Sequence, residues 1–123
     1  MKKDNIVKTK SLEFALLIIK VGQYLQIEKK EYILSKQAIR SGTSIGAIIQ
    51  ESEHAQSKAD FIHKLSISLK EANETEYWIE LLFKSGYIDI NCYNELDISI
   101  KELLRLLISI IKSSKAGYVR ATN

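Results

Sequence analysis

The sequence predicts an all-α protein made of four long helices packed as a bundle. Its 123 residues contain no proline and only five glycines, so few residues interrupt a helix. Apolar residues recur at spacings of three and four along four stretches, which is the pattern of amphipathic helices. With 46% hydrophobic and 27% charged residues, the chain has the composition and the length of one globular domain.

The first two helices are expected over residues 6–28 and 31–53. The apolar stripe of the first helix consists of Phe14, Leu17, Ile18, Val21 and Leu25, and that of the second consists of Leu34, Ala38, Ile45, Ile48 and Ile49. The connection between them, "IEKKE", contains neither glycine nor proline. No residue type therefore marks the boundary between these two helices.

The third helix is expected to start near residue 57 and to end before Gly86. In "SKAD", the Ser57 hydroxyl can accept from the backbone N–H three residues on while Asp60 reaches back, as in a capping box. Gly86 supplies the left-handed residue that ends a helix, with Ile88 placed to fold back onto the last turn. Asp89 is then the candidate N-cap of a fourth helix over residues 90–114.

The fourth helix is apolar around most of its circumference. A bundle helix buries about one face, so the surplus predicts a further interface, most simply between copies of this chain. The candidate interface residues are Ile100, Leu104, Leu107, Ile108 and Ile111. Residues 1–115 are expected to form a single four-helix-bundle domain, and residues 116–123, which show no periodicity, a flexible C-terminal tail.

The glycine-rich stretch "RSGTSIGAII" could be a phosphate-binding loop or a helix-packing seam. It has neither the GxxxxGK[ST] nor the GxGxxG spacing, and no strand precedes it. Gly42 and Gly46 instead lie four residues apart on one helix face, where small residues let another helix approach closely. Two glycines inside a helix cost roughly 2 kcal/mol, which close packing must offset. The predicted seam consists of Ala38, Gly42, Ile45 and Gly46.

Charge is distributed unevenly along the chain, although the net charge is only +3. Both ends of the sequence are basic and the middle is acidic, a pattern that allows contact with a nucleic-acid backbone. The candidate nucleic-acid-binding residues are Lys36 and Arg40 on the second helix and Lys58 and Lys64 on the third. Lys36 and Arg40 form a like-charge pair that an anion would stabilise, either a glutamate of the third helix or a phosphate.

No catalytic, metal or cofactor site is expected. His54 and His63 lie near acidic residues but in no recognised metal-binding pattern, and the single cysteine, Cys92, lacks a partner and is expected to be a small packing residue. The glutamates of the third helix, Glu71 and Glu74 among them, are expected to form a solvated or docking face. The sequence shows no signal peptide and no stretch apolar enough to span a membrane, so a cytoplasmic protein is expected.

Three stretches of the middle of the chain resemble a known family. They are "LSKQAIRSGTSIGAIIQE" at 34–51, "AQSKADFIHKLSISLKEANETEYWIELL" at 55–82 and "GYI" at 86–88. They are similar to bacterial four-helix-bundle proteins encoded in intervening sequences of the large-subunit ribosomal RNA gene, which often carry a ribosomal-protein-like label. The accessory variability proteins of diversity-generating retroelements share this fold. The resemblance implies an antiparallel up-down-up-down bundle, assembled as a homo-oligomer and most simply as a pentamer, without catalytic activity.

Three functions remain open at this point. The favoured one is a non-catalytic oligomer that contacts RNA or DNA through its phosphates, using basic residues of the second helix and of the chain ends. The first alternative is an adaptor that docks a protein partner such as a reverse transcriptase. The second is a structural bundle that retains no activity.

Overall fold

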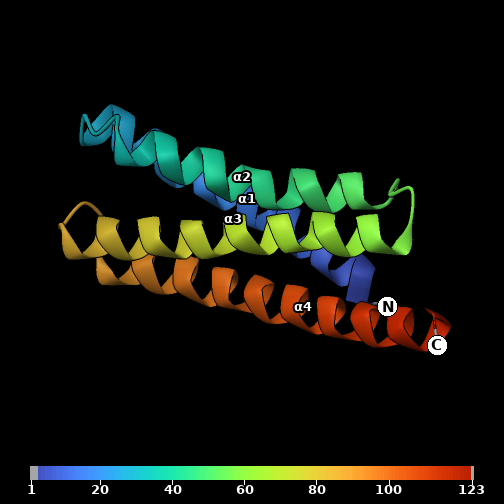
Figure 1. The fold of residues 1–123 in the computed structure, drawn as a ribbon. Coiled ribbons are helices and arrows are strands. Elements are labelled where there is room, and N and C mark those ends of the chain that lie inside the picture. The colour runs from blue at the N-terminus through green and yellow to red at the C-terminus, as the bar shows by residue number, and fades with distance from the viewer. Residues whose placement is uncertain (1–2, 123) are drawn as a thin grey trace.

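Four antiparallel helices form the whole of the described structure. The computed structural model describes the backbone of residues 3–122 and the side chains of residues 5–117. Its helices are α1 (Lys3–Glu28), α2 (Leu34–Ser52), α3 (Lys58–Lys84) and α4 (Ile90–Thr122), and no strand occurs in this range. Each helix packs on two others: α1 and α3 both contact α2 and α4, but not one another. This up-down-up-down arrangement confirms the predicted all-α four-helix bundle (Figure 1).

The helix ends around α3 are set by short-range hydrogen bonds that the sequence predicts. The Ser57 hydroxyl accepts from the Asp60 backbone N–H at 3.0 Å, and the Asp60 carboxylate accepts from the Gln56 N–H at 3.1 Å. At the other end, Gly86 has a φ of 85°, and the Tyr87 N–H donates to the Leu82 carbonyl at 3.0 Å. These bonds confirm the expected start and end of α3.

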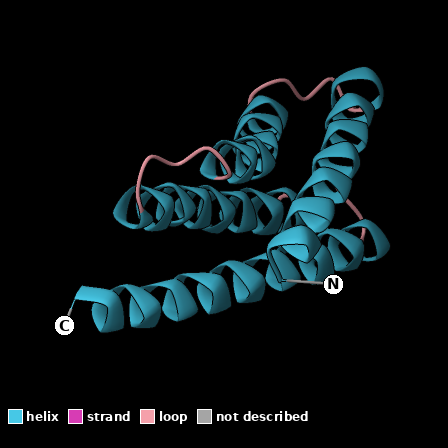
Figure 2. Cartoon of the chain, turned by 90° about the vertical axis from the view of Figure 1, so that its right-hand side faces the viewer, coloured by secondary structure: helices cyan, strands magenta, loops and turns pink. Residues whose placement is uncertain are grey.

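The start of α4 agrees with the prediction, but its end does not. The Asp89 carboxylate accepts from the Cys92 backbone N–H at 2.8 Å, which makes Asp89 the N-cap. The helix then continues to Thr122, past the end expected near residue 114. Its last turns extend beyond the other helices (Figure 2). The expected mobility of residues 116–123 stays a prediction, and Asn123 lies outside the described residues.

The connection between α1 and α2 is held by a buried carboxylate. Glu31 is buried, and its two oxygens accept from the backbone N–H groups of Ile33, Leu34 and Ser35 at 2.8–3.1 Å. Burial by itself would raise the pKa of Glu31, but the donors at Leu34, Ser35 and Ile33 together lower it below its usual value. Glu31 therefore satisfies the free N–H groups at the start of α2.

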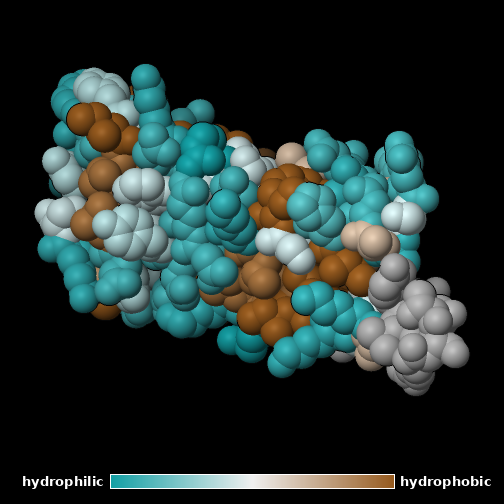
Figure 3. All heavy atoms as spheres, viewed as in Figure 1, coloured by the Kyte–Doolittle hydropathy of each residue, from teal (hydrophilic) through white to brown (hydrophobic). Residues whose placement is uncertain are grey.

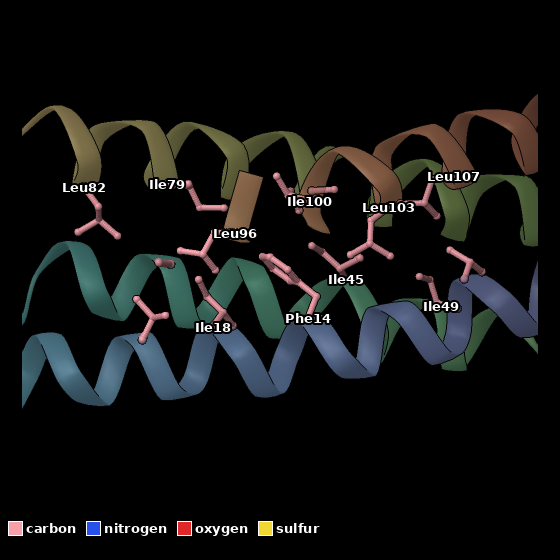
Figure 4. Packing of buried hydrophobic residues seen from close by; sticks show 14 of the residues in the cluster. Phe14, Ile18, Ile45, Ile49, Ile79, Leu82, Leu96, Ile100, Leu103 and Leu107 are labelled. Atoms are coloured by element: carbon pink, nitrogen blue, oxygen red, sulfur yellow. The ribbon is translucent and has the colours of Figure 1, made fainter. Parts of the chain in front are cut away.

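Apolar side chains from all four helices fill the centre of the bundle (Figure 4). Phe14 and Ile18 of α1 point into the space between the helices, while residues of α3 and α4 close the core from the other side. Members that are almost completely shielded from solvent include Phe14, Ile18, Ile45, Ile79, Leu96, Ile100, Leu103 and Leu107. Because every helix contributes to this cluster, its burial favours the four helices folding together.

Glycines let α1 and α2 approach one another closely. A Cβ atom on Gly42 would lie 2.9 Å from the Cγ2 of Ile18, and one on Gly22 would lie 2.3 Å from the Cδ1 of Ile39. One on Gly46 would lie 3.1 Å from the Ser11 hydroxyl oxygen. Side chains of each helix therefore occupy the space that glycines leave on the other, so that "RSGTSIGAII" lies in a helix–helix contact rather than in a loop.

Hydroxyl groups link α2 to α3 within the core. The Thr75 hydroxyl lies 2.8 Å from that of Ser41, and the Ser68 hydroxyl donates to the Ile45 carbonyl at 2.9 Å. All of these side chains are buried. Within the described part of the chain, no buried side-chain nitrogen or oxygen lacks a hydrogen-bond partner. The hydroxyl groups of this contact are therefore buried without the free-energy cost of an unpaired donor or acceptor.

Replacing Gly42 by leucine should weaken the bundle. The new side chain has to displace Ile18, and overpacking of this kind costs about 1–3 kcal/mol. Urea unfolding followed by circular dichroism measures the change in stability. The matched control is Gly117→Leu, because a Cβ at Gly117 meets nothing within 4 Å and the substitution should leave stability unchanged or slightly higher. Equal effects at the two sites would contradict the close-packed contact.

Replacing Glu31 by glutamine should cost about 0.5–2 kcal/mol of unfolding free energy at pH 7, the usual range for loss of a helix cap. Because the pKa of Glu31 is lowered by folding, its contribution is complete above the ordinary glutamate pKa of about 4.3 and is lost as the pH falls below it. The difference between parent and variant should therefore shrink between pH 7 and pH 3 in urea unfolding. A difference that stays constant would show that the ionised carboxylate is not the capping group.

Candidate nucleic-acid interface

The four cations predicted to bind nucleic acid do not form one site. Lys36 and Arg40 lie on α2, toward the end of the bundle where α1 joins α2. Lys58 and Lys64 lie on the first two turns of α3, at the opposite end. The structure therefore divides the candidates into two separate pairs.

Arg40 is already paired with two carboxylates of α3. Its guanidinium contacts Glu71 at 3.4 Å and makes a short contact with Glu74. The carboxylate oxygen of Glu74 that meets Arg40 also accepts from the indole N–H of Trp78 at 2.9 Å. The sequence leaves open whether a glutamate of the third helix or a phosphate pairs with Arg40, and in the structure the glutamates do. Arg40 thus links α2 to α3 and is poorly placed to bind a phosphate.

The other three candidate lysines differ in whether a charged or aromatic side chain already lies beside the ammonium group. The Lys64 ammonium lies 3.8 Å from the Asp60 carboxylate, an i,i+4 pair on α3. The Lys58 ammonium lies 5.3 Å from the centre of the Phe61 ring, within range of a cation–π contact. Lys36 is exposed and has no ion pair among the described residues. Lys58 and Lys36 therefore keep a charge that a phosphate could neutralise.

Folding brings both basic ends of the chain to the end of the bundle that carries Lys58. The start of α1 and the α2–α3 connection lie at that end (Figure 1), and the last turns of α4 run on past them (Figure 2). Val7 of α1, Lys58 of α3 and Ile110 of α4 line one cavity there. Lys112 and Lys115 of α4 are exposed, and neither forms an ion pair within the described range. Lys112 and Lys115 belong to the basic chain end that the sequence implicated, but periodicity could not show that the start of α3 would lie near that part of α4.

Ion pairs at this basic end fasten α1 to its neighbours. Lys8 lies 2.8 Å from Glu53 at the end of α2, and Lys10 lies 3.5 Å from Glu102 of α4. The hydrogen bond from Lys8 lowers the pKa of Glu53. Because Lys8 and Lys10 neutralise acidic side chains, the positive charge available to a ligand comes from Lys58, Lys112 and Lys115. The exposed Glu51 carries an opposing negative charge.

A cavity of about 520 Å³ opens at the same end. Its apolar lining includes Val7, Ile49, Phe61, Leu65 and Ile110, whereas Asn5, Glu53, Ser57 and Lys58 contribute polar groups. All four helices take part in it. The basic end is therefore hollowed rather than flat.

The predicted oligomer interface is only partly on the surface. Ile100, Leu107 and Ile111 are buried in the core of their own chain, so another copy cannot reach them without unfolding. Leu104 is half-buried, and Ile108 is 40% exposed. Further exposed apolar side chains lie on α4, where Ile98 is 69% exposed, and on α1, where Leu12 and Leu16 are 64% and 63% exposed. Leu12 and Leu16 are not among the predicted interface residues, because the sequence pattern assigns a single apolar stripe to the first helix and a solvated side opposite it.

Cys92, His54 and His63 were the other side chains considered for chemistry. Cys92 is half-buried, and burial, with the nearby Asp89 and Glu95 carboxylates, raises the pKa of its thiol, which makes it a weak nucleophile. His54 and His63 are exposed, and no group of three or more potential metal ligands occurs among the described residues. No helix in that range combines the length and the hydropathy that a membrane span requires.

These features define a small all-α bundle with one basic end and an apolar, close-packed interior. The chain belongs to the 23S rRNA-intervening sequence protein family, whose model matches residues 3–109. A crystal structure of a protein of unknown function from the S23 ribosomal protein family of Bacteroides thetaiotaomicron is 58% identical and superposes with a TM-score of 0.89. The similarity covers 90% of this chain and 99% of that one. No functionally curated protein matches.

The family membership confirms the resemblance found in the middle of the chain and extends it over α1 and most of α4. The relation to the accessory proteins of retroelements stays a prediction. The matched residues end at 109, so the last turns of α4, with Lys112 and Lys115, lie beyond the family model.

Replacing Arg40 by glutamine should lower the unfolding free energy by only about 0.2–1 kcal/mol, because the pair with Glu71 and Glu74 is partly exposed to solvent. Since Trp78 is the only tryptophan and shares Glu74 with Arg40, its fluorescence should also change. Urea unfolding and emission spectra measure both effects. Lys36→Gln, which removes an unpaired charge from the same helix, is the control and should change neither. A destabilisation well above this range would show that the pair is a main support of the α2–α3 contact.

Proposed function

We propose that this protein is a non-catalytic, oligomeric helical bundle that binds RNA through phosphate contacts at its basic end. The observation that carries the proposal is the cavity that Lys58 of α3 lines together with Ile110 of α4, because Lys112 and Lys115 follow within the next two turns of α4. None of these three lysines has an acidic partner in the described part of the chain. The association of the family with intervening sequences of 23S rRNA makes structured RNA the first ligand to test.

The chemistry of lysine determines what kind of binding is proposed. An ammonium group is a compact point charge on a flexible chain and lacks the planar fork with which arginine reads a base or grips a phosphate. Contacts of this kind position a nucleic acid but carry no sequence information. Binding should therefore be sensitive to salt and tolerant of sequence, and duplex DNA should compete with RNA.

Oligomerisation is the second part of the proposal. Exposed aliphatic side chains on α1 and α4 support it, as does the resemblance that implies a pentamer. Several copies would multiply the few lysines of each basic end, so that weak single contacts add up through avidity. Light scattering should then give a particle several times the 14.0 kDa of one chain.

The RNA proposal is tested by removing the three lysines together. Lys58→Gln/Lys112→Gln/Lys115→Gln should bind a structured 23S rRNA fragment more weakly. The slope of log K against log salt should fall by about 0.7–0.9 for each phosphate that the variant no longer neutralises. Filter binding over a range of salt concentrations measures both quantities. Circular dichroism checks that the variant remains helical.

The matched control removes the same charge from the opposite end. Lys29→Gln/Lys30→Gln/Lys36→Gln changes three exposed lysines that have no ion pair among the described residues and should leave affinity and slope close to those of the parent. Equally weakened binding by the two triple variants would show that net charge, and not the basic end, drives binding. Absence of RNA and DNA binding by the parent at low salt would overturn the proposal in favour of a protein-docking adaptor.

A further inference from the structure

Helix α1 carries apolar side chains on two opposite sides. Its inner side supplies Phe14, Ile18 and Leu25 to the core. A second stripe faces outward: Leu12, Leu16 and Ile27 are 64%, 63% and 64% exposed, and Ile19, half-buried, lies between them. Spacings of four, three and eight keep these side chains on one face of the helix. We call this the outer α1 stripe.

A second apolar surface lies on the face formed by α3 and α4. Figure 3 shows apolar side chains grouped around the N-terminal half of α3 and the adjoining part of α4. In these segments Ile108 of α4 is 40% exposed. Half-buried neighbours in the same segments are Ile62, Leu69 and Leu104. We call this the α3–α4 patch.

The two surfaces lie on different sides of the bundle. Helix α1 contacts α2 and α4 but not α3, so α1 and α3 occupy opposite corners. The outer side of α1 faces away from the core and therefore away from α3. A single partner cannot cover both surfaces from one direction.

We infer that the outer α1 stripe of one copy of this chain packs on the α3–α4 patch of the next copy. This inference rests on the oligomer of the proposed function and names its two contact surfaces. A chain that exposes two aliphatic surfaces on different sides can bury both by repeating one heterologous contact, whereas a twofold contact would cover only one. Burial of both explains why α1 is apolar on its solvent side.

The charges beside the two surfaces support a second copy as the occupant. Lys70 and Arg105, on α3 and α4, are exposed and have no ion pair in the described range. Beside the outer α1 stripe lies Glu13, whose contact with Lys10 is long at 3.9 Å. An unpaired cation of one copy would thus face the Glu13 carboxylate of the other.

Mixing two complementary variants tests the inference, with particle mass measured by size-exclusion chromatography and light scattering without RNA. Leu16→Glu damages the outer α1 stripe, and Ile108→Glu damages the α3–α4 patch. Each alone should fall to the 14.0 kDa of one chain. Mixed in equal amounts, they should form a complex of two chains, because Leu16 of one variant and Ile108 of the other remain intact. Ile33→Glu, at a 76% exposed residue in the α1–α2 connection, is the control and should keep the mass of the parent.

The other outcomes are distinct. If the parent forms oligomers but the mixture stays at 14.0 kDa, or if only one of the two variants dissociates, the heterologous contact is wrong while the proposed oligomer stands. If the parent itself has the mass of one chain, the oligomer and this contact both fall, and the RNA proposal is decided by its own titration. Leu16→Gln and Ile108→Gln replace the glutamate variants if circular dichroism shows either to be unfolded.

Discussion

The close approach of α1 and α2 is the constraint on which the rest of the structure depends. Ile18 occupies the space that Gly42 leaves, and Ile39 occupies the space that Gly22 leaves, so neither helix can rotate about its axis without a clash. This fixes which side of α1 enters the core. The same contact directs Leu12 and Leu16 outward, and the exposed aliphatic surface is therefore a consequence of the internal packing.

Features that depend on near neighbours in the sequence could be predicted. Ser57, Gly86 and Asp89 act within three or four residues, and their hydrogen bonds are present as expected. The cap of α2 was not predicted because Glu31 lies two residues before the usual capping position. Its acidic side chain also stands in a run of charged residues that looks solvated, yet it is buried.

Features that depend on tertiary contacts could be predicted only in part. In α4, apolar residues surround the helix, so periodicity could not separate Ile100 and Leu107, which fill the core, from Ile108, which reaches solvent. The partner of Arg40 depended on the register of α2 against α3, which brings Glu71 and Glu74 beside it. Likewise, the position of Lys58 near Ile110 of α4 follows from the topology of the bundle and from no local pattern.

The basic end adjoins one of the two apolar surfaces, which places both proposed activities in one particle. Lys112 and Lys115 follow Ile108 of the α3–α4 patch within two turns of α4, whereas the outer α1 stripe lies on the corner of the bundle opposite α3. Copies related by a rotation axis carry equivalent groups at the same height along that axis. A closed ring built through the helix sides would therefore gather every basic end at one level. A ring of modestly basic subunits could then bind a folded RNA through many phosphates at once, without any subunit being strongly basic.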